Sequence, residues 1–185
     1  MRLRVASIVV LGLLWFPCLP AAGEARTLPA ERTATLENDF IKLALDWSTG
    51  WPRLASIVDK LGAAPSLADR GFTLHVGKDH AITAEQCRVL DVESGCQPDG
   101  TRQIVLRLRH DASGLELCLA YTLAANDFFA RKTLAVRNPS EENAATLYRA
   151  EIERIQTDAT LELGGQGQPV FVGGRLFLGL EYPAG

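Results

Sequence analysis

Apolar and polar residues alternate one by one along most of the chain. In the segment 103–109 the apolar residues Ile104, Leu106 and Leu108 occupy every second position, and the same spacing runs from Leu115 to Leu123. Side chains in a strand alternate between two faces, so this pattern predicts half-buried strands. By the same criterion we expect strands at residues 40–47, 51–60, 72–76, 86–93, 103–109, 115–123, 129–138, 147–156, 159–163 and 170–180.

Short segments rich in turn-forming residues separate these strands. Examples are Ser48–Gly50, the sequence SGCQPDG at 94–100, and Asp111–Gly114. Residues 61–71 contain Gly, Pro, Ser and Asp and predict a longer loop with room for one short helical turn. No segment after residue 33 keeps a period of three to four. The pattern therefore predicts an all-β fold, an antiparallel β-sandwich.

The first 25 residues follow a different pattern. Arg2 and Arg4 precede an almost wholly apolar stretch from Val5 to Leu14, and small residues follow at 21–25. This order is typical of a secretory signal peptide, and the stretch is shorter than the roughly 20 residues of a membrane span. We expect a signal peptide at 1–25, a leader at 26–33 and one β-domain at 34–185. The protein is then secreted or periplasmic, with no membrane attachment after cleavage.

Charge and cysteine spacing exclude several kinds of partner. The formal net charge is -3 and no run of Lys or Arg stands out, so nucleic acid is not an expected partner. The chain has three histidines and no C-x-x-C spacing, so we predict no metal site and no cofactor. Cys87, Cys96 and Cys118 remain after signal cleavage. Cys87 and Cys96 are the closest pair in sequence and the candidate disulfide, although spacing does not decide the pairing.

The familiar sequence signatures of active sites are missing. The glycine-rich segment beginning at Gly164 has Val170 where a dinucleotide loop has its third glycine, and a strand follows instead of a helix. None of His75, His80 and His110 accompanies a G-x-S-x-G elbow. These features favour structural roles for both the glycines and the histidines.

Carboxylates flank several predicted strands, and glycoside hydrolysis uses two of them. They are Asp46, Asp59, Glu151, Glu153 and Glu181. Glu151 and Glu153 alternate with Ile152, which places them on one strand face that we expect to be solvated. Sequence spacing singles out no catalytic pair.

Aromatic residues supply the candidate sugar contacts. Trp47 and Trp51 flank the turn Ser48–Gly50, and Glu181 and Tyr182 close the last predicted strand. Aromatic rings offer flat apolar surface with a polar edge, which suits stacking on sugars. These four residues are the predicted substrate-binding residues.

Two stretches carry a resemblance to a known family. LENDFIKLALDWSTGWPRLASIVDK, with Leu54, Ser56, Ile57, Asp59 and Lys60, resembles the opening of galactose-mutarotase-like β-supersandwich domains. YTLAANDFFARKTLAVRNPSEENAATL, with Tyr121, Leu123, Asp127, Arg131 and Asn138, resembles a later piece of the same domains. GQPVFVGGRLFLGLEYPAG resembles a strand of the α-galactosidase (melibiase-type) members.

The resemblance implies the N-terminal, non-catalytic domain of a secreted glycoside hydrolase. In such enzymes the catalytic carboxylates lie on a separate barrel, so the expected partners are a carbohydrate and a downstream catalytic barrel, and no catalytic residue is assigned here. The supersandwich is expected to be incomplete at its C-terminus, because such domains are longer. The alternatives are a free-standing secreted carbohydrate-binding module and a periplasmic structural or interaction protein without sugar affinity.

Overall fold

The computed structural model describes residues 6–11, 31–62, 67–77, 80–140, 145–165 and 168–181. Within these ranges the regular elements are β-strands, apart from the single 3-10 turn η1 (Ala84–Gln86). The strands form four sheets, and all strand pairs except those of β1 are antiparallel. The predicted class, an all-β antiparallel sandwich, is confirmed.

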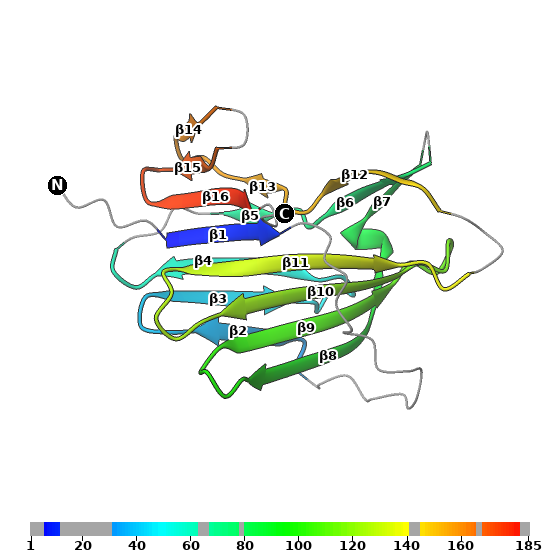
Figure 1. Ribbon diagram of the computed structural model, residues 1–185, viewed down its shortest axis with the longest axis horizontal. Helices are drawn as coiled ribbons and strands as arrows, with labels where there is room; N and C mark the ends of the chain where they lie inside the picture. The colour runs from blue at the N-terminus through cyan, green and yellow to red at the C-terminus, as the bar shows by residue number, and fades with distance from the viewer. Residues whose placement is uncertain are drawn as a thin grey trace.

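The largest sheet has eight strands (Figure 1). Their order is β14 (Leu161–Leu163), β15 (Val170–Val172), β16 (Leu176–Glu181), β1 (Ala6–Leu11), β11 (Phe129–Arg137), β10 (Glu116–Leu123), β9 (Arg102–Arg109) and β8 (Arg88–Cys96). Three smaller sheets complete the fold. One contains β2 (Thr33–Glu37), β3 (Ile41–Asp46) and β4 (Arg53–Asp59), and another contains β12 (Leu147–Glu151), β6 (Thr73–Val76) and β7 (His80–Thr83). The last pairs β13 (Ile155–Gln156) with β5 (Ala68–Asp69).

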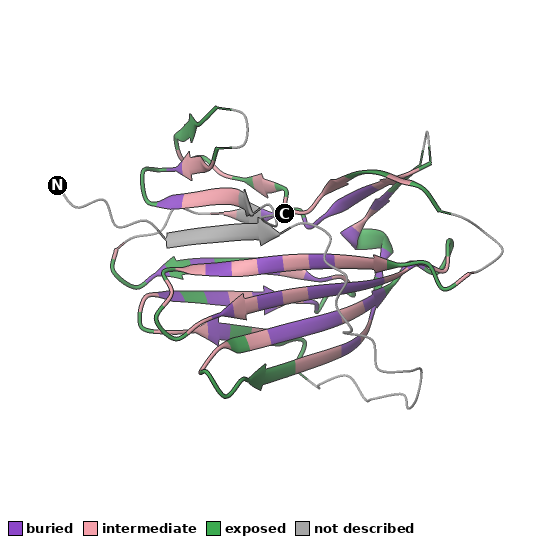
Figure 2. Cartoon of the chain, in the orientation of Figure 1, coloured by how far each residue is buried: buried purple, intermediate pink, exposed green. Residues whose placement is uncertain are grey.

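The core lies between the large sheet and the β2–β3–β4 sheet. Figure 1 shows β2, β3 and β4 layered behind the long strands β9, β10 and β11, and β2 contacts both β9 and β10. Alternate residues of the facing strands are buried, as the striping in Figure 2 shows. The buried positions include Ile41, Leu43 and Leu45 of β3, Ile104, Leu106 and Leu108 of β9, and Leu117, Leu119, Tyr121 and Leu123 of β10.

Asn38 joins the two layers. Its Oδ1 accepts the N–H groups of Phe40 and Ile41, both at 2.9 Å, which fixes the turn between β2 and β3. Its Nδ2 donates to the carbonyls of Ala124 and Asp127, at 2.9 and 2.8 Å, in the turn between β10 and β11. One side chain thus uses all its hydrogen-bonding groups to hold two hairpins of different sheets together.

The strand predictions hold for most of the chain, with several differences. β2 begins at Thr33, inside the predicted leader, β5 lies in the predicted loop 61–71, and β7 lies where no strand is predicted. β8 continues through Ser94–Cys96, where the sequence predicts a turn. The predicted strand 147–156 is interrupted after Glu151, and pairing resumes at Ile155 with a different partner strand. Which strand a segment pairs with depends on the tertiary structure, and the alternation of residues along one segment does not reveal it.

β1 lies within the predicted signal peptide. It pairs in parallel with β11 on one side and with β16 on the other, so it connects the β14–β16 hairpins to the rest of the large sheet. The sequence predicts that this segment is removed, whereas the structure uses it as an internal strand. In the part of the chain that the structure describes, no helix is long and apolar enough to cross a membrane.

Candidate functional site

A two-stranded ribbon brings two arginines side by side. β5 and β13 are antiparallel, with Asp69 paired to Ile155, and the ladder continues because the N–H of Arg70 donates to the carbonyl of Arg154 at 2.8 Å. Arg70 and Arg154 are therefore directly opposite each other across the two strands. Like charges in such a cross-strand position destabilise a sheet. The pair therefore has an energetic cost, although the pairing of the two strands does not itself require arginine at either position.

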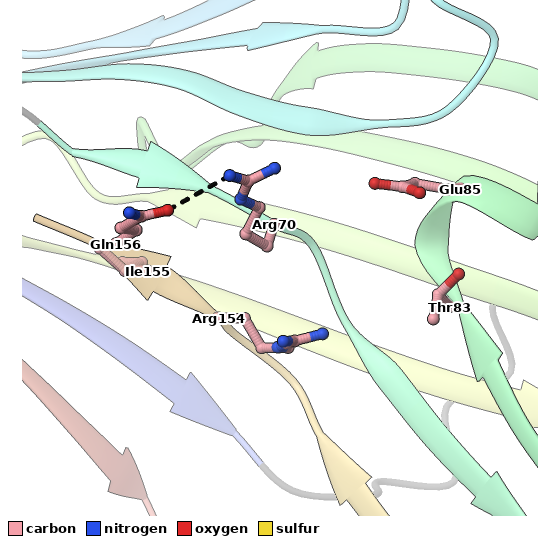
Figure 3. Close-up of a pocket in the computed structure, with 6 residues that line it drawn as sticks. All are labelled: Arg70, Thr83, Glu85, Arg154, Ile155 and Gln156. Atoms are coloured by element: carbon pink, nitrogen blue, oxygen red, sulfur yellow. Dashed lines mark hydrogen bonds between the residues drawn. The ribbon is translucent and has the colours of Figure 1, made fainter.

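Both arginines line an open polar cavity of about 480 Å³. The other lining residues are Thr83, Glu85, Ile155 and Gln156. Thr83 ends β7 and precedes η1, and the Gln86 side chain accepts its N–H at 2.9 Å, which fixes the turn that presents Glu85. Figure 3 shows the Glu85 carboxylate facing the Arg70 guanidinium across the cavity, and the Arg154 guanidinium pointing toward Thr83.

The two guanidinium groups are poorly neutralised by the protein. Arg70 donates to the neutral amide oxygen of Gln156 at 3.2 Å, and no described carboxylate lies within ion-pair distance of it. The Nε of Arg154 lies 3.8 Å from Glu151, a carboxylate already 2.9 Å from the guanidinium of Arg149 and 3.5 Å from the ring of His75. The cavity therefore carries excess positive charge although the whole chain is acidic.

Trp51 lies close to Gly71, the residue that follows Arg70. Gly71 has φ +67, and a Cβ added there would come within 2.5 Å of the Ala84 Cβ and 3.5 Å of Trp51 Cζ3. The glycine thus lets the edge of the indole pack closely against this backbone and the start of η1. Trp51 is partly buried and packs against the hydrophobic core, and it is not among the residues that line the cavity.

The other predicted sugar-binding residues have different positions. Trp47 is only 2 % exposed and is part of the hydrophobic core, so its ring is not presented to a surface ligand in this structure. Glu181 is the last residue of β16, where it pairs with Leu11 of β1. Tyr182 lies outside the described residues. Trp47 is not among the residues that line the polar cavity.

A buried charged cluster lies on the opposite side of the β5–β13 ribbon. Lys132 of β11 is 1 % exposed, and its Nζ lies 2.6 Å from Oε2 of Glu153 and 5.4 Å from the centroid of the Tyr121 ring. Asp69 accepts hydrogen bonds from the N–H groups of Leu54, at 2.6 Å, and Gly71. Asp69 lies close enough to Glu153 to raise the pKa of the Glu153 carboxyl group. Glu153 Oε1 is buried without a hydrogen-bond partner among the described residues.

Burial accounts for the protonation of this cluster. Desolvation raises the pKa of Glu153 to about 8, and the nearby Asp69 raises it further while Lys132 opposes the shift. Burial would lower the pKa of Lys132, but the nearby Glu153, Tyr121 and Asp69 outweigh it and raise the value. At neutral pH Glu153 is therefore mostly protonated beside the charged Lys132, which reduces the charge left buried.

This burial corrects the expectation for Glu153. The sequence predicted Glu151 and Glu153 on one solvated strand face, but β12 ends at Glu151, and the side chain of Glu153 is 7 % exposed against 27 % for Glu151. Glu151 and Glu153 both line a second cavity, of about 430 Å³, whose other walls are mostly apolar residues of segment 150–157 and of β14, β15 and β16. Both carboxylates are engaged by basic side chains, Glu153 by Lys132 and Glu151 by Arg149.

The remaining carboxylates and histidines singled out by the sequence have structural partners. Asp46 accepts the N–H of Ser48 at 2.7 Å and pairs with Arg53; the Ser48 hydrogen bonds are the main cause that lowers its pKa to about 2. Asp59 accepts the N–H of Leu61 at 2.8 Å. His110 is buried, and its Nδ1 lies 2.8 Å from the Ser113 hydroxyl within a tight turn.

The proposed disulfide between Cys87 and Cys96 is wrong. The two residues lie at opposite ends of β8, and nine residues of strand span roughly 30 Å at about 3.3 Å per residue. A disulfide requires Cα atoms within about 7 Å. Both thiols are free; Cys87 is buried, and desolvation raises its pKa to about 12.

The chain matches no family model, no curated protein and no solved structure at a significant level. Among the described residues there is also no group of His, Cys, Asp and Glu that could hold a metal ion.

Sequence reasoning missed Arg70, Arg154, Thr83, Glu85 and Gln156. They come from two strands and a turn that are separated by up to 86 residues, as in the Arg70–Gln156 hydrogen bond. A local signal existed only for Arg70, which lies in the breaker-rich sequence ADRG at the end of a predicted loop. Which arginine lies opposite it depends on the register of β5 and β13.

Proposed function

We propose that this chain is a non-catalytic, carbohydrate-associated β-sandwich domain of an exported glycoside hydrolase. The observation that carries the proposal is the open cavity lined by Arg70, Thr83, Glu85, Arg154 and Gln156. Sugar recognition combines planar polar groups that bind several hydroxyls with an apolar ring face. The cavity provides the polar groups, and Trp51 is the aromatic residue packed near Gly71, which follows Arg70 in the sequence.

The same cavity argues for binding rather than hydrolysis. Glu85 is the one carboxylate among its described lining residues, whereas glycoside hydrolysis uses two carboxyl groups about 5 to 10 Å apart. The buried pair Asp69 and Glu153 lies beneath the ribbon and is engaged with backbone N–H groups and Lys132. The role proposed for the domain is therefore to hold or orient a saccharide beside a separate catalytic barrel.

Binding to a panel of mono- and polysaccharides tests the proposal, with calorimetry and tryptophan fluorescence as readouts. We expect at least one saccharide to bind and to change the emission of Trp51, and Glu85→Gln and Trp51→Phe to weaken that binding. Trp47→Phe is the matched control, because the Trp47 side chain is buried away from the cavity. If no saccharide binds, the alternative of an interaction protein without sugar affinity takes its place.

Whether a catalytic barrel accompanies this domain needs a separate observation. A reading frame that continues past residue 185 into alternating strand and helix patterns would support the association with a catalytic barrel. A stop codon at that point, together with sugar binding by the isolated chain, would favour the free-standing carbohydrate-binding module.

A further inference from the structure

We infer that the saccharide bound at this cavity is acidic, and that the cross-strand pair Arg70 and Arg154 binds the carboxylate of a uronic acid residue. The inference rests on the proposed function and specifies the class of sugar. Its starting point is the position of the two arginines, directly opposite each other on the β5–β13 ribbon and both lining the cavity.

The described carboxylates neutralise the two arginines only in part. Arg70 is hydrogen-bonded to an amide, and Arg154 shares Glu151 with Arg149 and His75. Two guanidinium groups held in cross-strand positions repel each other. An anion placed between them removes that repulsion and accepts hydrogen bonds from both.

The chemistry of the donors selects a carboxylate. A guanidinium is planar, stays charged at all physiological pH values, and binds carboxylates through two parallel N–H···O bonds. In Figure 3 the Arg70 guanidinium lies between Gln156, to which it donates, and the open space in front of Glu85.

The rest of the cavity suits the sugar ring that carries the carboxylate. Thr83 and Glu85, which also line the cavity, can exchange hydrogen bonds with ring hydroxyls. Because Glu85 is itself negative, it disfavours a second carboxylate on its own side. The ligand is thereby oriented with its acid group toward the arginines and its hydroxyls toward Thr83 and Glu85.

The test compares galacturonate, its uncharged methyl ester, galactose, glucuronate and glucose as ligands of the full chain. We expect at least one of the two uronates to bind about tenfold or more tightly than its neutral counterpart, since charge-assisted hydrogen bonds are about twice as strong as neutral ones. Raising the salt concentration should reduce this preference. Arg70→Gln and Arg154→Gln should each remove most of it.

Arg109→Gln is the matched control. Arg109 is an exposed strand arginine on β9, 3.8 Å from Asp111, and is not among the residues that line the cavity. It should leave uronate binding unchanged. Thermal unfolding of all three variants shows whether a loss of binding reflects a loss of fold.

The outcomes separate the two proposals. Equal affinity for uronates and neutral sugars, or variants that keep the preference, overturns the acidic-sugar inference and leaves carbohydrate binding intact. Acetate or sulfate competing as well as the uronate at equal concentration also overturns it, because the cavity would then bind any anion. If no saccharide of either kind binds, the proposed function fails together with the inference.

Discussion

At the scale of single residues, the buried position of Glu153 is the feature with the clearest physical consequence. Its side chain is 7 % exposed and accepts a hydrogen bond from Lys132, and the nearby Asp69 raises its pKa further. Burial raises its pKa from 4.5 to about 8. The folded state therefore holds a proton that the unfolded state releases between these two pH values.

This linkage predicts a pH dependence of stability. Because the folded protein binds more protons than the unfolded chain between pH 4.5 and 8, the contribution of Glu153 is fully present below about pH 4.5 and is lost as pH rises toward 8. The loss is on the order of 5 kcal/mol in the free energy of unfolding. Glu153→Gln, whose neutral amide can still accept a hydrogen bond from Lys132, should remove this part of the dependence.

Urea unfolding between pH 5 and 9 measures the effect. Glu162→Gln, at an exposed position on β14, is the control and should keep the wild-type pH profile. A Glu153→Gln profile parallel to that of the wild type over the whole range would contradict the assignment of the proton to Glu153.

At the scale of elements, contacts between two hairpins give structural roles to three of the residues that carry the family resemblance. Asn38 bridges the β2–β3 and β10–β11 turns, and Lys60 donates to the Asn38 carbonyl at 2.6 Å. In the second turn, Asp127 pairs with Arg131 at 3.2 Å, while the rings of Phe40 and Phe128 stack across the junction with centroids 4.2 Å apart. Lys60, Asp127 and Arg131 thus belong to one structural junction, remote in sequence but contiguous in space.

The junction predicts a large effect of a small substitution. Asn38→Ala removes four hydrogen bonds, two within the β2–β3 turn and two that link the sheets. At about 0.5 to 1.5 kcal/mol each, we expect a loss of about 2 to 4 kcal/mol in the free energy of unfolding. Denaturant titration measures it. Asn126→Ala, at an exposed position in the neighbouring turn, should cost less than about 0.5 kcal/mol. Equal effects of the two substitutions would show that Asn38 does not join the layers.

At the scale of the whole molecule, β1 determines how the β14–β16 hairpins attach. It is the parallel partner of both β11 and β16, and it lies in the segment that the sequence predicts to be cleaved. The buried core of the described residues is contributed mainly by residues 36–134, with Val172 and Leu176 from the hairpin region. Loss of β1 therefore affects the attachment of β16 more than it affects the sandwich.

Hydrogen exchange tests this expectation by comparing the full chain with a chain that starts at residue 26. We expect the amides of β16 to lose protection in the shorter chain, because their β1 partner is gone, while β9 and β10 keep theirs. Unchanged protection of β16 would show that another strand takes the place of β1 or that β16 pairs with β11 directly. Mass spectrometry of the exported protein shows in parallel whether residues 1–25 are removed.

The sequence by itself determined the class of fold and most strand positions. Period-two alternation in segments such as 103–109 and 115–123 reports burial against a core, and turn residues such as Gly114, with φ +72, are required by local backbone geometry alone. Both are properties of a few neighbouring residues. They can therefore be recognised without knowing which strands pair.

Only the tertiary structure decided which residues form the site. The cavity depends on β5 and β13 pairing in a register that places Arg70 opposite Arg154, and the close packing of Trp51 nearby depends on Gly71. The break after Glu151 turned Glu153 inward, and the length of β8 separated Cys87 from Cys96. Each of these outcomes follows from pairing between segments distant in sequence, where a shift of one residue exchanges the two faces of a strand.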